Sequence, residues 1–250
     1  MAADESRETV SFPAGVDVWP SGDRVAIDMC CEPVPGSTYT ANATGEALGD
    51  PTLLHSGGIF PAVDPKGQRI ALSTQASGGS IVIVDTDGER IHEITGQSDA
   101  PGVGEIAWSP HGQQLAFEWG GEDAGVWVVE ADAANLDDAR EVAGRSQAVF
   151  ESPAFRADGM LVVTESDPPA VRNMADQRRP EGESTGIVLD PATGQTLASF
   201  DYDGRALHQD YDASGRYLAY SLSDGRVRWR GGGDAGEILP ADSQLSALAW

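Results

Sequence analysis

The residues of this chain with the clearest capacity to bind a partner lie in a polar stretch between two apolar runs. Arg172, Arg178 and Arg179 occur within eight residues, although the chain has 40 acidic against 16 basic residues and a formal net charge of −24. A guanidinium group is planar and pairs with a carboxylate or phosphate through two hydrogen bonds. The cluster predicts recognition of an acidic group on a partner; the alternative is a solvated loop whose charges serve solubility.

Carboxylates that follow or interrupt the apolar runs form a second set of candidates. They could surround one opening of a closed fold and bind a hard cation there, which needs about six converging oxygen ligands. Nothing in their spacing demands such a site. His208 joins the arginines as a partner-binding candidate, and Asp28 is expected near the same opening. The speculative metal ligands are Glu105, Glu118, Glu151 and Glu165.

Three short motifs resemble catalytic or cofactor-binding signatures but stand in the wrong context. "GESTG" around Ser184 matches a nucleophile elbow, which requires a strand before it and a helix after it. Here a proline-rich stretch precedes it and an apolar run follows. "HEITG" at His92 lacks the second histidine of a metalloprotease helix. "GVGEIA" at 102–107 leads into a strand, with no helix to hold a pyrophosphate. No catalytic residue and no cofactor are predicted.

The elements that must position these residues repeat along the chain. The phrase "EIAWSPHGQQLAF" at 105–117 has counterparts in which a glycine separates two apolar runs. These corner glycines, at intervals of 45, 45, 47 and 56 residues, are Gly22, Gly67, Gly112, Gly159 and Gly215. Four positions before each of them stands an apolar or aromatic residue, namely Val18, Val63, Trp108, Phe155 and Tyr211. A period in the forties is typical of a repeat architecture.

Each unit predicts four short strands. Asp-Gly or Thr-Gly separates two β-branched runs late in the unit, which is typical of a hairpin, and no long segment has the 3.6-residue apolar period of a helix. A sheet of four antiparallel strands has two apolar faces, and several such sheets bury them by packing around an axis. The sequence therefore predicts an all-β fold, a β-propeller of four-stranded antiparallel blades.

The repeat phrases also resemble a known family. "IAWSPHGQQLAF" and "FPAVDPKGQRIAL", the latter followed by "IVIVDTDGERIHEIT", are similar to the repeats of TolB-type, WD-like propellers. The resemblance covers nearly the whole chain from about Val16. In TolB itself, the family implies an envelope scaffold that docks a partner lipoprotein. The resemblance implies a protein or cell-envelope partner here, but no partner-contacting residue of TolB matches a position of this chain.

The repeat predicts where the blades begin and end. An acidic tail at 1–12 is expected before a single propeller domain at 13–250. The final "LSALAW" aligns with "GEIAW" and places Trp250 at the position of Trp108, which predicts five full repeats plus a sixth innermost strand, from a six-bladed or truncated propeller. The alternative is that this strand completes a sheet with the N-terminal "ETVSF". The expected repeats are 16–58, 59–103, 104–149, 150–206 and 207–243, with a partial repeat at 244–250.

Composition restricts the partner class. The strong negative charge repels phosphate backbones and anionic lipid, which argues against binding nucleic acid or a membrane surface, and no apolar stretch approaches the roughly 18 residues of a membrane span. The N-terminus as written has no secretory signal, which favours the cytoplasm. The family resemblance favours the cell envelope if a signal was removed. A monomer is favoured.

Length variation between the units indicates where function could lie. It concentrates between the second and third strands, and the stretch at 165–186 is the longest. Insertions gathered on one face of a repeat protein often mark its binding face. The expected function is a non-catalytic propeller scaffold that binds a partner through this face. The alternative is the propeller part of an enzyme, with an acidic or metal site at the channel mouth, or the gating domain of a peptidase whose catalytic domain is absent here.

Overall fold

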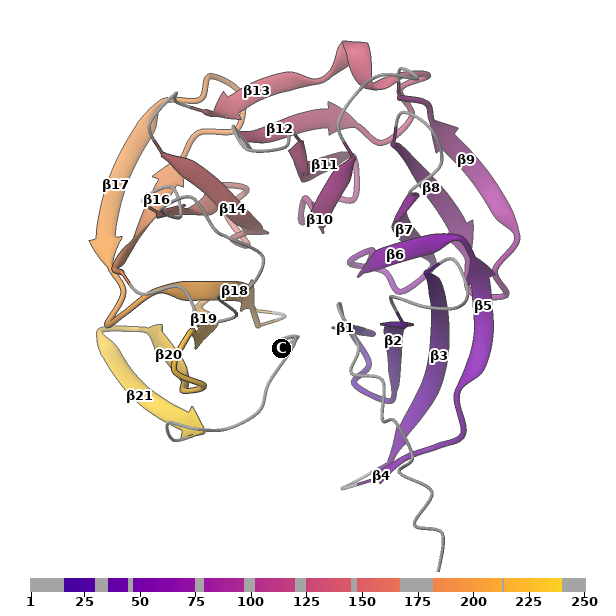
Figure 1. Cartoon of the computed structure of the whole chain (residues 1–250), viewed down its shortest axis with the longest axis horizontal. Helices are drawn as coiled ribbons and strands as arrows, with labels where there is room; N and C mark the ends of the chain where they lie inside the picture. Colours follow the sequence, from indigo (N-terminus) through magenta and orange to yellow (C-terminus); the bar gives the residue numbers. More distant parts are fainter. Residues whose placement is uncertain are drawn as a thin grey trace, which may run out of the picture.

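The computed structural model of the chain describes residues 16–29, 36–44, 47–74, 79–96, 102–119, 125–144, 148–166, 182–212 and 214–239. Within this part the regular structure is β, apart from one turn of 3-10 helix, η1 (Leu136–Asp138). The strands form five separate antiparallel sheets, which Figure 1 shows arranged around a central axis. These sheets are blades 1 to 5 of a β-propeller, as the sequence predicts.

The first strand of each blade lies innermost and the last outermost (Figure 1). Blade 1 contains β1 (Val16–Val18), β2 (Arg24–Met29), β3 (Ser37–Thr44) and β5 (Thr52–Ser56), with a two-residue β4 (Ala47–Leu48) beside β3. Blade 2 contains β6 (Gly58–Val63), β7 (Arg69–Thr74), β8 (Ser80–Asp85) and β9 (Arg90–Ile94). Blade 3 contains β10 (Val103–Trp108), β11 (Gln114–Trp119), β12 (Gly125–Glu130) and β13 (Arg140–Ala143). Blade 4 contains β14 (Val149–Phe155), β15 (Leu161–Ser166), β16 (Ser184–Leu189) and β17 (Thr196–Asp201). Blade 5 contains β18 (Ala206–Tyr211), β19 (Tyr217–Leu222), β20 (Val227–Gly231) and β21 (Asp234–Leu239).

The five corner glycines stand in the turns between first and second strands, and each innermost strand ends four residues before its glycine. Their φ angles lie between +63° and +84°, a left-handed conformation that glycine adopts without a steric penalty. Each glycine N–H donates to the carbonyl three residues earlier at 2.7–2.9 Å, which closes a tight turn. These turns emerge at one end of the propeller, the turn face. The connections between second and third strands emerge at the opposite end, the long-loop face.

The hydrophobic core lies between neighbouring blades. Between blades 2 and 3, for example, Ala71 and Ile83 pack with Val103 and Trp108, and similar clusters join blades 1 and 2, 3 and 4, and 4 and 5. Along the inside of the ring, β1 packs beside β6, β6 beside β10, β10 beside β14, and β14 beside β18. Among the described strands no comparable packing joins β18 to β1. The buried side chains therefore stabilise the blades as a stack around the axis.

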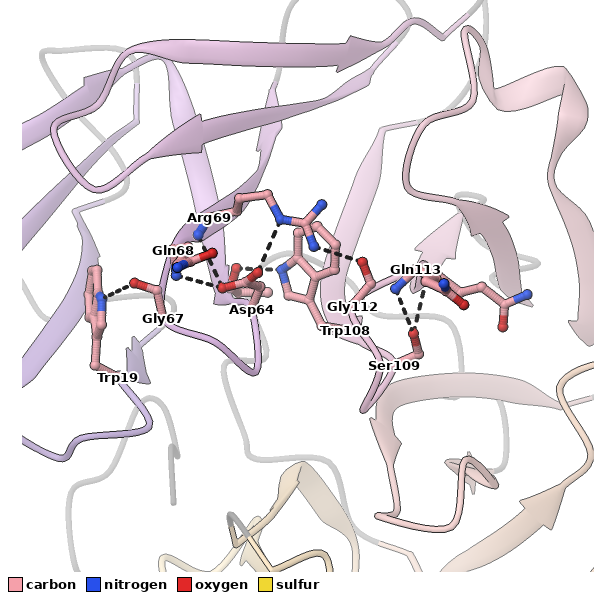
Figure 2. A network of polar contacts seen from close by, with 11 residues as sticks. Trp19, Asp64, Gly67, Gln68, Arg69, Trp108, Ser109, Gly112 and Gln113 are labelled. Carbon is pink, nitrogen blue, oxygen red and sulfur yellow. Dashed lines mark hydrogen bonds and ion pairs between the residues drawn. The ribbon is translucent and has the colours of Figure 1, made fainter.

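The polar residues of the repeat phrase tie one blade to the next, as Figure 2 shows for blades 2 and 3. The buried Asp64 carboxylate accepts hydrogen bonds from the backbone and the Nε of Arg69, the latter at 3.0 Å. The Arg69 guanidinium donates to the carbonyl of Gly112 at 2.7 Å and lies 4.5 Å from the centre of the Trp108 ring. Trp108 Nε1 in turn donates to the carbonyl of Ala62 at 2.9 Å. These residues are framework.

Several predictions fall outside the described residues. They are the acidic tail at 1–12, the N-terminal strand "ETVSF" at 8–12 and the sixth innermost strand at 244–250. Among the residues that the structure describes there is no long apolar helix that could span a bilayer.

Candidate functional site

The longest connection of the long-loop face carries the predicted arginine cluster. It joins β15 to β16 and has 17 residues, 167–183, whereas the corresponding connections of the other blades have 4 to 7. Arg172, Arg178 and Arg179 lie outside the described residues. Both ends of the connection are fixed, because the buried hydroxyls of Ser166 and Ser184 lie 2.8 Å apart in a hydrogen bond. A long segment of chain is thus mounted on a rigid base.

The base of this connection also reaches blade 5. Ser184 pairs in register with Ser166 across β15 and β16, and its hydroxyl accepts a hydrogen bond of 3.1 Å from the N–H of Ala206 at the start of β18. The carbonyl of Ser184 accepts a further bond from the N–H of Tyr202 at 3.0 Å. The connection therefore emerges where blades 4 and 5 meet.

A charged cluster lies nearby at the inner ends of blades 3 to 5, where the channel opens on the long-loop face. Its members are Glu105, Glu118, Glu151, Arg205 and His208, and we call it the channel-mouth cluster. His208 Nδ1 makes a short hydrogen bond to Glu105, and Arg205 lies 3.8 Å from Glu151. Glu105 and His208 both stand seven residues before the corner glycine of their blade, so the repeat brings them to the same level of the channel.

Burial and like charges perturb the titration of this cluster. Burial, together with the neighbouring charges of Glu105 and Glu151, raises the pKa of Glu118 to about 8, although hydrogen bonds from the backbone act in the opposite direction. Burial alone lowers the pKa of His208, but its hydrogen bond to Glu105 and the surrounding carboxylates outweigh this effect and raise the pKa above its usual value. The cluster is therefore built to hold a proton at neutral pH.

Glu118, which is half-buried, also has a structural partner in the next blade. Its Oε1 accepts a 2.7 Å hydrogen bond from the N–H of Ser152, on the innermost strand of the next blade. Asp28, at the same distance from its own corner glycine, accepts a 2.7 Å bond from the N–H of Phe60 in the next blade. Ser152 and Phe60 both have positive φ, 51° and 50°, at a β-bulge of the innermost strand. The carboxylates thus hold strained bulges in place between blades.

These hydrogen bonds between blades were not predicted from the sequence, although the spacing of the carboxylates indicates that they are equivalent. Asp28 and Glu118 both stand six residues after a corner glycine, and the constant spacing could have identified them as equivalent. Glu165 stands at the same position of blade 4, between Phe150 and Thr185 in the sheet register.

Among the described residues no group of three or more His, Cys, Asp or Glu side chains is arranged to hold a metal ion, so the metal hypothesis gains no support there.

The channel itself contains a cavity of about 550 Å³, which extends from the corner turns of the turn face to Glu105 and His208. Asp17 and Asp210 line it at equivalent positions, five residues before their corner glycines. Burial raises the pKa of Asp17 to about 7, against hydrogen bonds from the N–H groups of Val63 and Val18 that lower it. Asp17 was not predicted from the sequence, although blades 2, 3 and 4 have alanine at this position, in Ala62, Ala107 and Ala154.

No protein-family model matches this chain, and the search of curated proteins finds no match. Solved structures do match. A chain of a nidogen/laminin complex aligns with a TM-score of 0.66 and 15% identity, over 90% of this chain and 79% of that chain. TolB from Acinetobacter baumannii aligns with a TM-score of 0.60 and 13% identity, over 88% of this chain and 51% of that one. The propeller domain of Cps50 (Swd1) from Myceliophteria thermophila aligns with a TM-score of 0.58 and 16% identity, over 87% of this chain and 64% of that chain.

At these identities the likeness concerns the fold. It confirms the TolB-type, WD-like propeller that the repeat phrases predict, with five described blades.

Proposed function

We propose that this chain is a non-catalytic propeller scaffold that binds a protein or cell-envelope partner through its long-loop face. One observation carries the proposal. The 17-residue connection between β15 and β16 far exceeds the 4 to 7 residues found elsewhere on that face. A connection of this length is uncommon between paired strands and costs conformational entropy when it is ordered, so its presence on a rigid base favours a role in recognition.

The charged residues of the propeller body support a scaffold over a reaction centre. Glu118 and Asp28 have backbone partners in the next blade, and Glu105 is paired with His208. Asp64 and Arg69 connect corner turns. These groups are occupied in holding blades together, whereas a catalytic acid or nucleophile must be presented to a substrate.

The partner chemistry follows from the arginines. Arg172, Arg178 and Arg179 are a local concentration of positive charge on a chain of net charge −24, and guanidinium groups favour carboxylate or phosphate. The acidic remainder of the surface repels a partner that approaches elsewhere with the same sign of charge. One similar structure is a complex of nidogen with laminin, which supports a protein as the partner class. The cell-envelope location rests on the likeness to TolB.

Affinity capture from a native extract tests the proposal. In one variant, residues 168–183 are replaced by Asn-Gly, which suits the hairpin left between the paired β15 and β16. A second variant reverses two charges of the connection, Arg178→Glu with Arg179→Glu. The matched control reverses two exposed charges in corner turns of the turn face, Lys66→Glu with Arg216→Glu.

We expect both long-loop variants to lose the partner that the unmodified chain captures, because the recognition groups are removed or inverted. The control should retain it. The opposite pattern, with partner lost only in the turn-face control, would place recognition at the other end of the propeller and refute the proposal.

A further inference from the structure

We propose that the channel cavity of about 550 Å³ binds a small organic cation, namely an alkylguanidinium group. The cavity reaches the corner turns of the turn face, where Gly22 and Gly215 belong to its lining. That end of the propeller lies opposite to the long-loop face, so the proposal goes beyond the function proposed for that face.

The cavity has the size and the walls of a site for an organic molecule. Pockets that bind small molecules have volumes of about 300 to 1,000 Å³ and mostly apolar walls. Prolines of three corner turns belong to the lining. Each of the five blades also contributes one aromatic residue, and these are Trp19, Phe60, Trp108, Phe155 and Tyr211. A ligand with a carbon skeleton can contact such walls, whereas a bare metal ion needs converging oxygen atoms.

The charge of the lining selects a cation. Its acidic members are Asp17, Glu105, Asp210 and Asp212, and His208, which also lines the cavity, is bonded to Glu105. Among the described residues of the lining there is no lysine or arginine. The cavity therefore attracts positive charge and repels carboxylate or phosphate, and the net charge of −24 on the chain acts in the same direction.

Asp17 can accept hydrogen bonds from such a ligand. One of its carboxylate oxygens accepts a 2.7 Å bond from the N–H of Val18, and the other accepts a bond from the N–H of Val63. A carboxylate has about four lone-pair sites, so both oxygens keep capacity for a donor in the cavity. Burial raises the pKa of Asp17 to about 7, and a cation bound beside the carboxylate would stabilise its charged form.

The chain itself combines guanidinium groups with aromatic rings at this end of the propeller. The Arg69 guanidinium is bonded to the Asp64 carboxylate and lies 4.5 Å from the centre of the Trp108 ring (Figure 2). The Arg24 guanidinium lies 4.4 Å from the centre of the Trp19 ring. A guanidinium group is planar, stacks on aromatic rings and is more weakly hydrated than an ammonium group. The carboxylates and rings of the cavity therefore favour a guanidinium group over an ammonium group.

A matched pair of probes tests the charge of the ligand. n-Butylguanidinium and n-butylurea have nearly the same size and shape, but only the first is positively charged. Titration calorimetry of the whole chain at pH 8 should show binding of butylguanidinium and at least about tenfold weaker binding of butylurea. Equal affinities, or no binding of butylguanidinium, would overturn the proposal.

Variants of the acidic lining test the site. Asp17→Asn should weaken the binding of butylguanidinium at least about tenfold, and Asp210→Asn serves as the second variant if the first fails to fold. Asp234→Asn removes an equal charge at an exposed position of β21 and is the matched control, which should bind as the unmodified chain does. If the lining variants bind as tightly as the control, the site is wrong.

The pH dependence of binding provides a second readout. With a pKa of about 7, the ionised fraction of Asp17 rises about tenfold between pH 6 and 8, so the affinity for butylguanidinium should rise by about that factor. His208, whose pKa is raised, loses its proton over the same direction of pH and adds to the rise, while Glu105, Asp210 and Asp212 are the other charged groups of the lining. The rise should be smaller in Asp17→Asn, and an equal rise in both chains would contradict the role of Asp17.

Indole N–H signals in NMR spectra locate the probe in the unmodified chain. Trp19 and Trp108 line the cavity, whereas Trp127 and Trp229 lie outside its lining. Butylguanidinium should shift the signals of the first pair, and shifts confined to the second pair would overturn the proposal. A capped Gly-Arg-Gly peptide identifies the source of the cation. The same shifts with this peptide assign the site to a peptide side chain, and their absence assigns it to a free small molecule.

Discussion

Replacing Glu118 by glutamine should flatten the dependence of stability on pH. In the folded chain the pKa of Glu118 is raised to about 8 from 4.5 by burial and by the charges of Glu105 and Glu151. Between these two pH values the folded chain holds a proton at Glu118 that the unfolded chain has released. The stabilisation is fully present below about pH 4.5, is lost as the pH rises towards 8, and then levels off.

The magnitude follows from proton linkage. One proton held only in the folded state changes the free energy of unfolding by about 1.4 kcal/mol per pH unit, so between pH 5 and 8 the unmodified chain should lose roughly 3 to 4 kcal/mol through Glu118. Asp17, whose pKa is raised to about 7, and His208, whose pKa is also raised, act in the same direction. The stability that Asp17 and His208 lose with rising pH is also lost in the Glu118→Gln variant. The free energy of unfolding of the variant should therefore fall less steeply with pH than that of the unmodified chain, but it should still fall.

Urea denaturation at pH 5, 6, 7 and 8 and constant ionic strength measures the effect. Glutamine keeps an oxygen that accepts the Ser152 N–H but carries no charge to bury. Glu118→Gln should therefore match the unmodified chain near pH 5 and exceed it at pH 8 by about 3 kcal/mol. Glu237→Gln, at an exposed position of β21, is the control and should keep the original slope. Parallel slopes for Glu118→Gln and the unmodified chain would refute a Glu118 carboxyl group that stays protonated in the folded chain.

Three further predictions concern the framework. Asp64→Ala should lower the free energy of unfolding by about 3 kcal/mol, because Asp64 holds the arginine that reaches the next blade. Asp212→Ala, at the equivalent position of blade 5, should lower it by less. Equal losses for the two variants in urea denaturation would contradict this. Gly22→Ala should cost about 1 kcal/mol through its positive φ. Gly215→Ala should cost more, because its Cβ would come within 2.2 Å of a backbone nitrogen of blade 4; thermal unfolding should rank the two, and the reverse order would be inconsistent with blade packing. Replacing 168–183 by Asn-Gly should preserve the β-type circular dichroism and a cooperative transition, since the flanking strands are fully paired; a broad, non-cooperative transition would show that the connection is part of the core.

The repeat made the fold predictable because its signals are local. A glycine at the corner and a large apolar residue four positions earlier are both fixed by the backbone of one turn, and Gly112 with Trp108 stands as expected. The blade-to-blade contacts are not local. Glu118 gains its partner only when Ser152 of another blade is placed beside it, so its sequence context indicated a carboxylate near an opening but not what holds it.

Asp17 illustrates a second limit. Its carboxylate is bound by the N–H of Val63, which is 46 residues away, and burial in the channel raises its pKa. Neither the hydrogen bond from Val63 nor the burial of the side chain can be predicted from the strand sequence "VDV". Its only signal is that alanine occupies the same position in three other blades, which becomes visible once the strands are superposed on the corner glycines.

The location of the bound partner tests the account most directly. Hydrogen exchange of the purified complex, compared with the free chain, should show slower exchange in peptides that span 165–186 and in the channel-mouth cluster. The corner turns at 64–68 and 212–216 should exchange at unchanged rates. Protection confined to those corner turns, with 165–186 unaffected, would contradict recognition through the long-loop face.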